Sequence, residues 1–228
     1  MIEEIYKDVF KISGESNVYF LKEENILIDA GYPQDEMMIE KYLSKVISLD
    51  KIKTVVFTHL HYDHIGNFHL FKNATFYASK EEISSLKEDK YKAILSKPIA
   101  DRFNVDVKDI SSLKLPDYLE VIYTPGHSKG SLCIYDKRRK ILFSGDTLFF
   151  NENIGRMDLF FSSPKEMPSS LREIPGLEEL VITRTPVPAA PITILMAATS
   201  LSACRKQPPI SGIRADMYSG ISVCGVIG

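Results

Sequence analysis

The sequence predicts a mixed α/β fold, on two observations about its pattern. Short runs of β-branched, aromatic and aliphatic residues recur as far as Ile182 and are separated by Gly, Pro and charged turns, which is typical of strands. Between these runs lie polar segments whose apolar residues have helical spacing. The length of 228 residues, with 44% hydrophobic and 25% charged, is typical of a globular chain that forms one large domain or two small ones.

The first predicted elements are a hairpin, a helix and a buried strand. Residues 18–31 hold two apolar runs around Lys-Glu-Glu-Asn, which predicts a hairpin closed by Gly31. Residues 34–49 predict a helix with acidic residues early in the segment. The apolar positions of residues 51–59 are continuous, so we expect a strand that is covered on both faces.

The later elements follow the same signals. Residues 74–79 predict a strand, and residues 80–96 predict a polar helix that stops before Pro98. Residues 80–90 of this helix are expected to form a solvated face. Residues 163–174 predict a short helix, with Pro168 in its first turn or breaking it. Four further strands are expected at residues 118–127, 130–136, 140–146 and 177–182.

Charge and cysteine content restrict the class of protein. A net charge of −2 provides no basic surface for nucleic acid or acidic membranes. The N-terminus lacks the pattern of a secretory signal, and no uncharged apolar run reaches the roughly 20 residues that cross a bilayer. Three cysteines form no even disulfide framework. We therefore expect a cytoplasmic protein that binds neither nucleic acid nor membrane.

Three of the five histidines crowd the end of the strand predicted at residues 51–59. Residues i and i+2 of an extended segment point the same way, so His59 and His61 project together and can share one metal. Asp63 and His64 come after the chain turns and reach a neighbouring position. Imidazole and carboxylate ligands suit Zn²⁺, and also iron or manganese. The alternative is a set of surface histidines in a loop, which the small number of histidines disfavours.

Two later strand ends carry side chains of the same kind. His127 lies in the Pro-Gly turn of "TPGHSKGS", and Asp146 follows Gly145 in "ILFSGDTLF". Taken singly, His127 could be a turn residue and Asp146 the cap of a following turn. Both follow buried strands, however, and functional residues gather at strand ends in layered α/β folds.

The segments "HLHYDH", "PGHSKGS" and "SGDTLF", in this order, resemble the metallo-β-lactamase superfamily. The segments "NVYFL", "LIDAG" and "IGRMD" make the sequence more closely similar to its glyoxalase II-like (hydroxyacylglutathione hydrolase-like) enzymes. The resemblance covers about Val9 to Ile182, and we expect residues 1–182 to form the hydrolase domain. It implies a four-layer αββα sandwich with a two-metal site at one edge of its sheets.

The resemblance also implies a ligand set and a reaction. The implied ligands are His59, His61 and His127 on one metal, Asp63 and His64 on the other, and Asp146 bridging both. A hydroxide shared by two such cations attacks a carbonyl carbon near pH 7, and Asp63 is placed to orient the nucleophile and handle its proton. We therefore expect one or two Zn²⁺ per chain, and a small thioester or related activated ester as the substrate.

The sequence departs from the family pattern after Ile182. The family supplies one further histidine in a "PGHG"-like turn, but this chain reads "LVITRTPVP" there and has no histidine after His127. Charge also becomes sparse and prolines frequent in residues 183–228. Thr-Arg-Thr written ACC-CGG-ACA and followed by C reads Pro-Gly-His one base later, which favours a frameshift. We expect this atypical C-terminal segment to be the least ordered part of the chain.

Five residues have weaker claims to a role. His69 is expected to pack or to support a ligand, and Cys133 to fill the core. Asp29 is expected to be structural or to support a ligand. Arg156 is a candidate for binding an acidic group of the substrate. Asp158 is expected to be structural, as the partner of Arg156 in an ion pair.

Three alternatives remain open. The same scaffold supports a mononuclear iron dioxygenase that acts on persulfides, and the missing histidine favours a one-metal centre. RNA processing is disfavoured by the balanced charge. A catalytically impaired member of the family is the non-enzymatic alternative. The sequence leaves the oligomeric state open.

Overall fold

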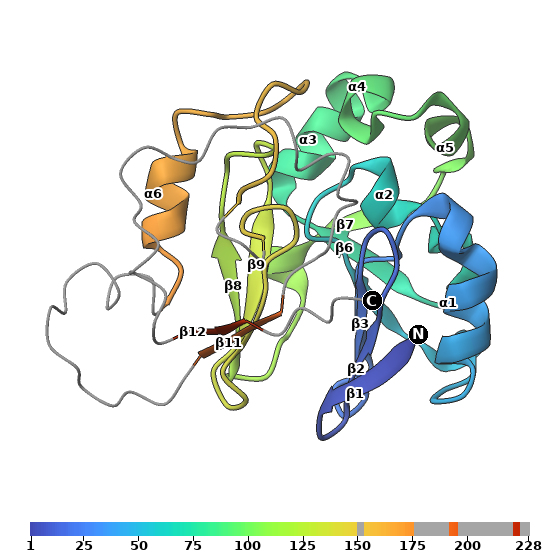
Figure 1. Cartoon of the computed structure of the whole chain (residues 1–228). Coiled ribbons are helices and arrows are strands. Elements are labelled where there is room, and N and C mark those ends of the chain that lie inside the picture. The colour runs from blue at the N-terminus through green and yellow to red at the C-terminus, as the bar shows by residue number, and fades with distance from the viewer. Residues whose placement is uncertain (150–152, 176–191, 196–220, 224–228) are drawn as a thin grey trace, which may run out of the picture. The chain divides into compact units, whose positions relative to one another are not determined.

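The structure is a computed structural model that describes residues 1–149, 153–175, 192–195 and 221–223, the last two ranges by their backbone alone. The chain divides into two compact units (Figure 1). The first unit comprises Met1–Lys114, and the second begins at Leu115. Each unit contains one β-sheet. These sheets and their helices confirm the predicted mixed α/β class.

The sheet of the first unit has seven strands in chain order, β1 to β7. Neighbours are antiparallel from β1 to β4 and parallel from β4 to β7, because crossovers replace hairpins after β4. The pairing of β3 with β4 confirms the predicted hairpin. The strands are β1 (Ile2–Tyr6), β2 (Val9–Ile12), β3 (Val18–Leu21), β4 (Ile26–Ile28), β5 (Thr54–Val56), β6 (Thr75–Ala78) and β7 (Val107–Asp109).

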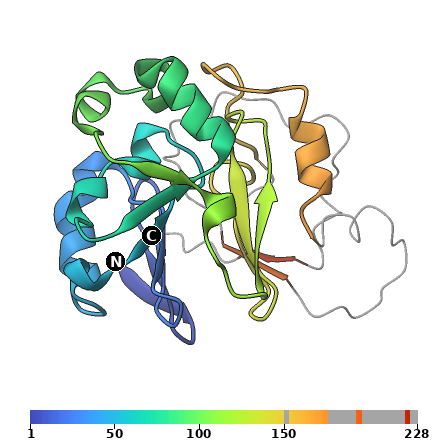
Figure 2. The ribbon, with the colours of Figure 1, turned by 180° about the vertical axis from the view of Figure 1, so that it is seen from behind.

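Five α-helices accompany this sheet. They are α1 (Glu36–Leu43), α2 (Tyr62–Ile65), α3 (Lys80–Glu88), α4 (Lys90–Ile94) and α5 (Lys97–Arg102). Helices α3, α4 and α5 follow one another closely, and α3 packs near β7 (Figure 2). Short 3₁₀ turns occur at Pro33–Asp35, Leu49–Lys51, Phe68–Leu70 and Ile110–Ser112.

Two helix predictions were wrong in extent. The single helix expected at residues 80–96 is broken at Asp89, whose extended backbone (φ −154°, ψ 97°) ends α3. Its side chain then accepts the backbone N–H groups of Tyr91 and Lys92 and so caps α4. The expected end before Pro98 is confirmed, because α4 ends at Ile94. Pro98 itself lies in the first turn of α5, a position that lacks an intrahelical donor in any case, so it begins a further helix. The helix expected at residues 34–49 ends at Leu43.

The core of the first unit holds the end of β5, the strand that precedes His59. Val55, Val56 and Phe57 are all buried, which confirms that β5 is covered on both faces. Phe57 stacks on Phe76 of the neighbouring strand β6, with ring centroids 5.7 Å apart. The end of β5 is therefore rigidly held just before His59.

The second unit contains a five-stranded sheet in the order β12-β11-β10-β9-β8. Its strands are β8 (Leu119–Tyr123), β9 (Leu132–Asp136), β10 (Ile141–Phe143), β11 (Ile192–Leu195) and β12 (Ile221–Val223). Strands β8 to β10 correspond to three of the predicted strands and form an antiparallel meander, and α6 (Met167–Arg172) starts with Pro168 in its first turn, as expected. The strand expected at residues 177–182 lies outside the described residues, as does most of the atypical C-terminal segment.

Over the described part of the chain, none of the helices combines the length and the apolar character needed to cross a membrane.

Candidate metal centre

The predicted ligands of the first unit lie in the turn between β5 and α2. His61 has an extended backbone (φ −67°, ψ 149°) and immediately precedes α2, which begins at Tyr62. His59 and His61 therefore come before the helix, whereas Asp63 and His64 lie within it. This confirms that the chain turns between the two pairs of side chains.

These side chains gather in one place. The candidate ligand atoms of His59, Asp63 and His64 lie within 4.8 Å of one another. The His59 ring centroid is 4.6 Å from that of His61 and 4.1 Å from that of His64. The three imidazoles are buried, while the Asp63 side chain is 22% exposed. The alternative of a loose group of surface histidines is therefore wrong.

Asp29 and Thr58 fix the proton positions on two of these rings. Asp29 Oδ2 lies 2.8 Å from Nδ1 of His64, and a carboxylate can only accept, so Nδ1 of His64 carries the proton. The Thr58 hydroxyl donates to Asp29 Oδ2 at 2.9 Å. Its oxygen is therefore left to accept from Nδ1 of His59, 3.2 Å away. In both rings Nε2 is then the nitrogen without a proton, which is the state that a histidine needs in order to bind a metal through this atom.

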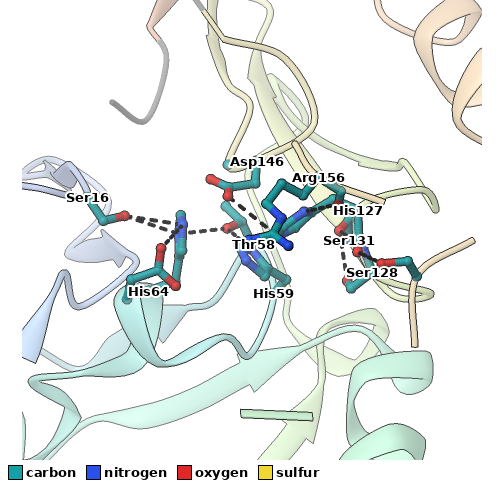
Figure 3. A network of polar contacts seen from close by, with 12 residues as sticks. Ser16, Thr58, His59, His64, His127, Ser128, Ser131, Asp146 and Arg156 are labelled. Atoms are coloured by element: carbon teal, nitrogen blue, oxygen red, sulfur yellow. Dashed lines mark hydrogen bonds and ion pairs between the residues drawn. The ribbon is translucent and has the colours of Figure 1, made fainter. Parts of the chain in front are cut away.

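Further contacts hold this cluster from the side of β3 and β4. Figure 3 shows Ser16 and Thr58 on opposite sides of the His64 ring, and Ser16 Oγ lies 3.2 Å from His64 Nε2. The carbonyl oxygen of His64 accepts the N–H of Ala30 at 2.6 Å. The buried Asn67 side chain donates to the carbonyl oxygen of Ala30 at 3.0 Å. Helix α2 is thus bound to the end of β4, next to Asp29.

Glu82 corrects one prediction. Residues 80–90 are expected to present only a solvated helix face, but the Glu82 side chain is 2% exposed. Its Oε2 accepts the backbone N–H of Leu60 at 2.8 Å. A polar helical pattern does not reveal which acidic residue turns inward, so the sequence offered no signal for this contact.

The predicted ligands of the second unit follow β8 and β10. Figure 3 shows the contact between His127 and the carbonyl oxygen of Arg156, which accepts from His127 Nδ1 at 2.7 Å. Nδ1 of His127 therefore carries the proton, because a carbonyl oxygen has none to give. Nε2 lies on the other side of the ring, 3.4 Å from Asp146 Oδ2. His127 is thus held in the same tautomer as His59 and His64.

Backbone geometry fixes this second group of residues. Gly145 has a positive φ of 50°, which turns the chain sharply after β10 and before Asp146. The carbonyl oxygen of Asp146 accepts the N–H of Gly155 at 2.9 Å. A Cβ atom at Gly155 would collide with that carbonyl oxygen and lie 2.8 Å from the His127 ring. Glycine at this position therefore lets the segment bearing Arg156 approach His127.

The weaker candidates have structural surroundings. His69 Nε2 lies 3.0 Å from Glu36 Oε1, so this histidine contacts α1. Cys133 is buried, and burial raises the pKa of its thiol to about 11, which confirms a core residue. Arg156 donates two hydrogen bonds to Asp158, each of 2.9 Å, and this pairing raises the pKa of Arg156 and lowers that of Asp158. The Arg156 guanidinium is half exposed.

The donor set fits a divalent metal. The buried imidazoles of His59 and His64 converge with the Asp63 carboxylate, and nitrogen and oxygen ligands of this kind suit zinc, iron and manganese. The anchored Nδ1 atoms are a second feature of metal-binding histidines. The meeting of these residues with His127 and Asp146 in one centre stays a prediction.

Comparisons with known proteins agree with this chemistry. The family model described as the metallo-beta-lactamase superfamily matches residues 13–183. A probable metallo-hydrolase of Methanocaldococcus jannaschii, MJ0296, is 34% identical over 161 residues, which are 69% of each chain. The acyl-coenzyme A thioesterase MBLAC2 of Homo sapiens is 25% identical over 64% of this chain and 62% of its own. The hydroxyacylglutathione hydrolase of Bartonella henselae is 31% identical over 56% of this chain and 46% of its own.

Solved structures show the same fold. TTHA1623, crystallised in a di-iron-bound form, matches with a TM-score of 0.53 and 24% identity, over 76% of this chain and 85% of that chain. This likeness confirms the predicted fold class. The family model spans most of the chain and all six predicted ligands, and the chain therefore belongs to the metallo-β-lactamase superfamily.

Proposed function

We propose that this member of the superfamily is a metal-dependent hydrolase that cleaves a thioester or a related activated ester. The observation that carries the proposal is the common state of three imidazoles. His59, His64 and His127 each have Nδ1 anchored by an oxygen, which directs Nε2 towards a metal. Histidines that only pack in a core do not require that the same ring nitrogen, Nδ1, be hydrogen-bonded to an oxygen in each of them.

The proposed centre uses the six ligands that the sequence predicts. One metal would be held by His59, His61 and His127, the other by Asp63 and His64, and Asp146 would be a ligand of both. Zinc is the proposed metal because imidazole and carboxylate ligands suit it. Iron and manganese accept the same ligands, and the solved structure of TTHA1623 holds two irons.

Asp63 is the proposed catalytic residue. When bound, divalent metals lower the pKa of water and polarise a carbonyl oxygen, which supplies the nucleophile and the electrophile of a hydrolysis. The partly exposed carboxylate of Asp63 lies in the ligand cluster, 3.9 Å from His64 Nε2, where it can hold a water molecule and take its proton. Asp29 and Thr58 keep the protons of His64 and His59 on Nδ1, so these rings do not compete for that role.

The substrate class is supported by the relatives and by the charge. One relative is named an acyl-coenzyme A thioesterase and another a hydroxyacylglutathione hydrolase, which favours a glyoxalase II-like reaction on a small molecule. The net charge of −2 disfavours a nucleic acid substrate. The half-exposed Arg156 guanidinium is the proposed contact for an acidic group of the substrate, although it must exchange its contacts with Asp158. A cytoplasmic location belongs to the same proposal.

The test combines metal analysis with three substrate classes. Freshly purified full chain is analysed for zinc, iron and manganese, and hydrolysis of an acyl-coenzyme A or hydroxyacylglutathione is compared with that of a β-lactam and a phosphodiester. We expect thioester cleavage to be the fastest, to stop after chelation, and to return when metal is restored. Faster turnover of the phosphodiester would overturn the substrate class. Bound iron together with persulfide-dependent oxygen uptake would favour the dioxygenase instead.

A further inference from the structure

Glu82 is a buried acidic residue that the proposed reaction does not use. It lies in the first turn of α3, and its side chain is 2% exposed. The helix is capped by Ser79, whose hydroxyl accepts the Glu82 N–H at 3.1 Å. The Glu82 side chain accepts the N–H of Leu60 at 2.8 Å. A buried carboxylate is costly unless it is hydrogen-bonded, and the contact with Leu60 provides such a hydrogen bond.

Leu60 is the residue between two predicted ligands. Its side chain is fully buried in the core of the first unit, and its N–H is held by Glu82. The residue is thus fixed through its side chain and through its backbone. His59 and His61, on either side of it, then have little freedom to rotate relative to one another, and their rings lie almost perpendicular, at 88°.

The contact also links the ends of two neighbouring strands. The ligand-bearing turn follows β5, whereas Ser79 and α3 follow β6, and these strands pair in parallel. The N–H of Phe57 extends the pairing by donating to the carbonyl oxygen of Tyr77 at 2.8 Å. Leu60 lies beyond the end of β5 and no longer pairs with β6. The hydrogen bond from its N–H to Glu82 therefore connects the segment after β5 to the helix that follows β6.

We propose that Glu82 is a positioning residue of the metal centre, which sets the mutual orientation of His59 and His61 by holding the N–H of Leu60. The inference rests on the proposed function, since it takes these histidines to be metal ligands. It acts through a hydrogen bond, so an acceptor of the same shape should replace the carboxylate. Residues that support metal ligands in this way typically contribute roughly 10–100-fold to metal affinity.

The experiment measures cobalt(II) binding to the full chain by chelator competition and by the visible absorption of the bound ion, which reports ligand geometry. Glu82→Ala should weaken cobalt binding by about tenfold or more and alter the absorption spectrum. Glu82→Gln keeps an oxygen that can accept from Leu60, so it should retain the spectrum and stay within about threefold of the unaltered affinity. Glu81 on the same helix is exposed, and Glu81→Ala and Glu81→Gln are the matched controls, with no expected change.

Thermal melting of the metal-free variants separates positioning from folding. If Glu82→Ala melts earlier but binds cobalt with unchanged affinity and spectrum, Glu82 is merely structural and the inference fails. It fails equally if Glu82→Gln loses as much affinity as Glu82→Ala. If the unaltered chain itself binds no cobalt, the proposed function fails first, and the inference with it.

Discussion

Oδ2 of Asp29 lies 2.8 Å from Nδ1 of His64, and the same oxygen accepts the proton of the Thr58 hydroxyl at 2.9 Å. One carboxylate therefore determines the tautomers of two predicted ligands, His64 directly and His59 through Thr58. Asp29 has a positive φ of 60°, a conformation that Asp and Asn tolerate better than most other residues. Its charge can therefore be changed without a change of backbone.

Asp29→Asn should lower metal affinity by roughly 10–100-fold, because the amide replaces a charged acceptor and loosens both rings. The affinity is measured by competition with a chelator. Asp8 has nearly the same φ, 61°, and its N–H is bound to Glu4 away from the cluster, so Asp8→Asn is the matched control. Equal affinities for the two variants would show that Asp29 does not govern the ligands.

Replacement of His59, His61 or His127 by Ala should remove at least one tightly bound metal and abolish hydrolysis, because each change deletes a ligand. Metal content is measured by elemental analysis of the purified variants. His69 is the control, since it contacts Glu36 and not the ligand cluster. We expect His69→Ala to retain both metal and activity. Full metal content in all three ligand variants would refute the assignment.

Asp146→Asn distinguishes a bridging ligand from a turn residue. As a bridge, Asp146 affects both metals, so metal content and activity should fall while the melting temperature of the metal-free protein changes little. A residue that only capped a turn would contribute about 1 kcal/mol to stability and nothing to metal binding. A large loss of metal-free stability with metal retained would therefore favour the cap.

Cys133 should resist alkylation in the folded protein. Burial raises the pKa of its thiol to about 11, so at pH 8 the reactive thiolate is scarce as well as inaccessible. Labelling with iodoacetamide is followed by mass spectrometry of the peptide that contains Cys133, which separates it from the other two cysteines. Unfolding in guanidinium chloride should restore rapid labelling. Rapid labelling of the folded protein would show that the strand around Cys133 opens readily.

The missing histidine after Ile182 predicts close to one tightly bound metal per chain. In the proposed ligand set, the second metal would be held by Asp63 and His64 and would share Asp146 with the first, so its site should be weak. A chain in which "PGHG" replaces "TRTP", followed by a family-like final helix, should bind two metals and turn over faster. Metal stoichiometry of both chains tests this. Two tightly held metals in the present chain would mean that residues 183–228 supply a ligand.

Much of the fold, and the grouping of the candidate ligands at residues 59–64, could be predicted because both depend on local patterns. Apolar continuity predicted β5, and the alternation of an extended segment predicted that His59 and His61 project together. A turn of the chain was expected between these histidines and Asp63, and α2 begins there.

Contacts between distant segments could not be read in the same way. The inward turn of Glu82 depends on the hydrogen-bonding demand of Leu60, 22 residues earlier in the chain. The break between α3 and α4 depends on the extended backbone of Asp89, a residue that helices also tolerate. Strands β1 and β2 were not predicted, because β1 carries polar residues at successive positions and β2 has only four residues, so both give a weak signal.

The contact between His127 and residue 156 involves the backbone carbonyl oxygen of that residue, an atom that every amino acid possesses. Natural variation at position 156 can therefore leave the histidine correctly held, even where the arginine is replaced. The neighbouring Gly155 is different, because any side chain there would strike Asp146 and the ring of His127. We expect a saturation scan of this segment, with metal binding as the readout, to be tolerant at Arg156, whose backbone makes the hydrogen bond, and intolerant at Gly155, which has no side chain.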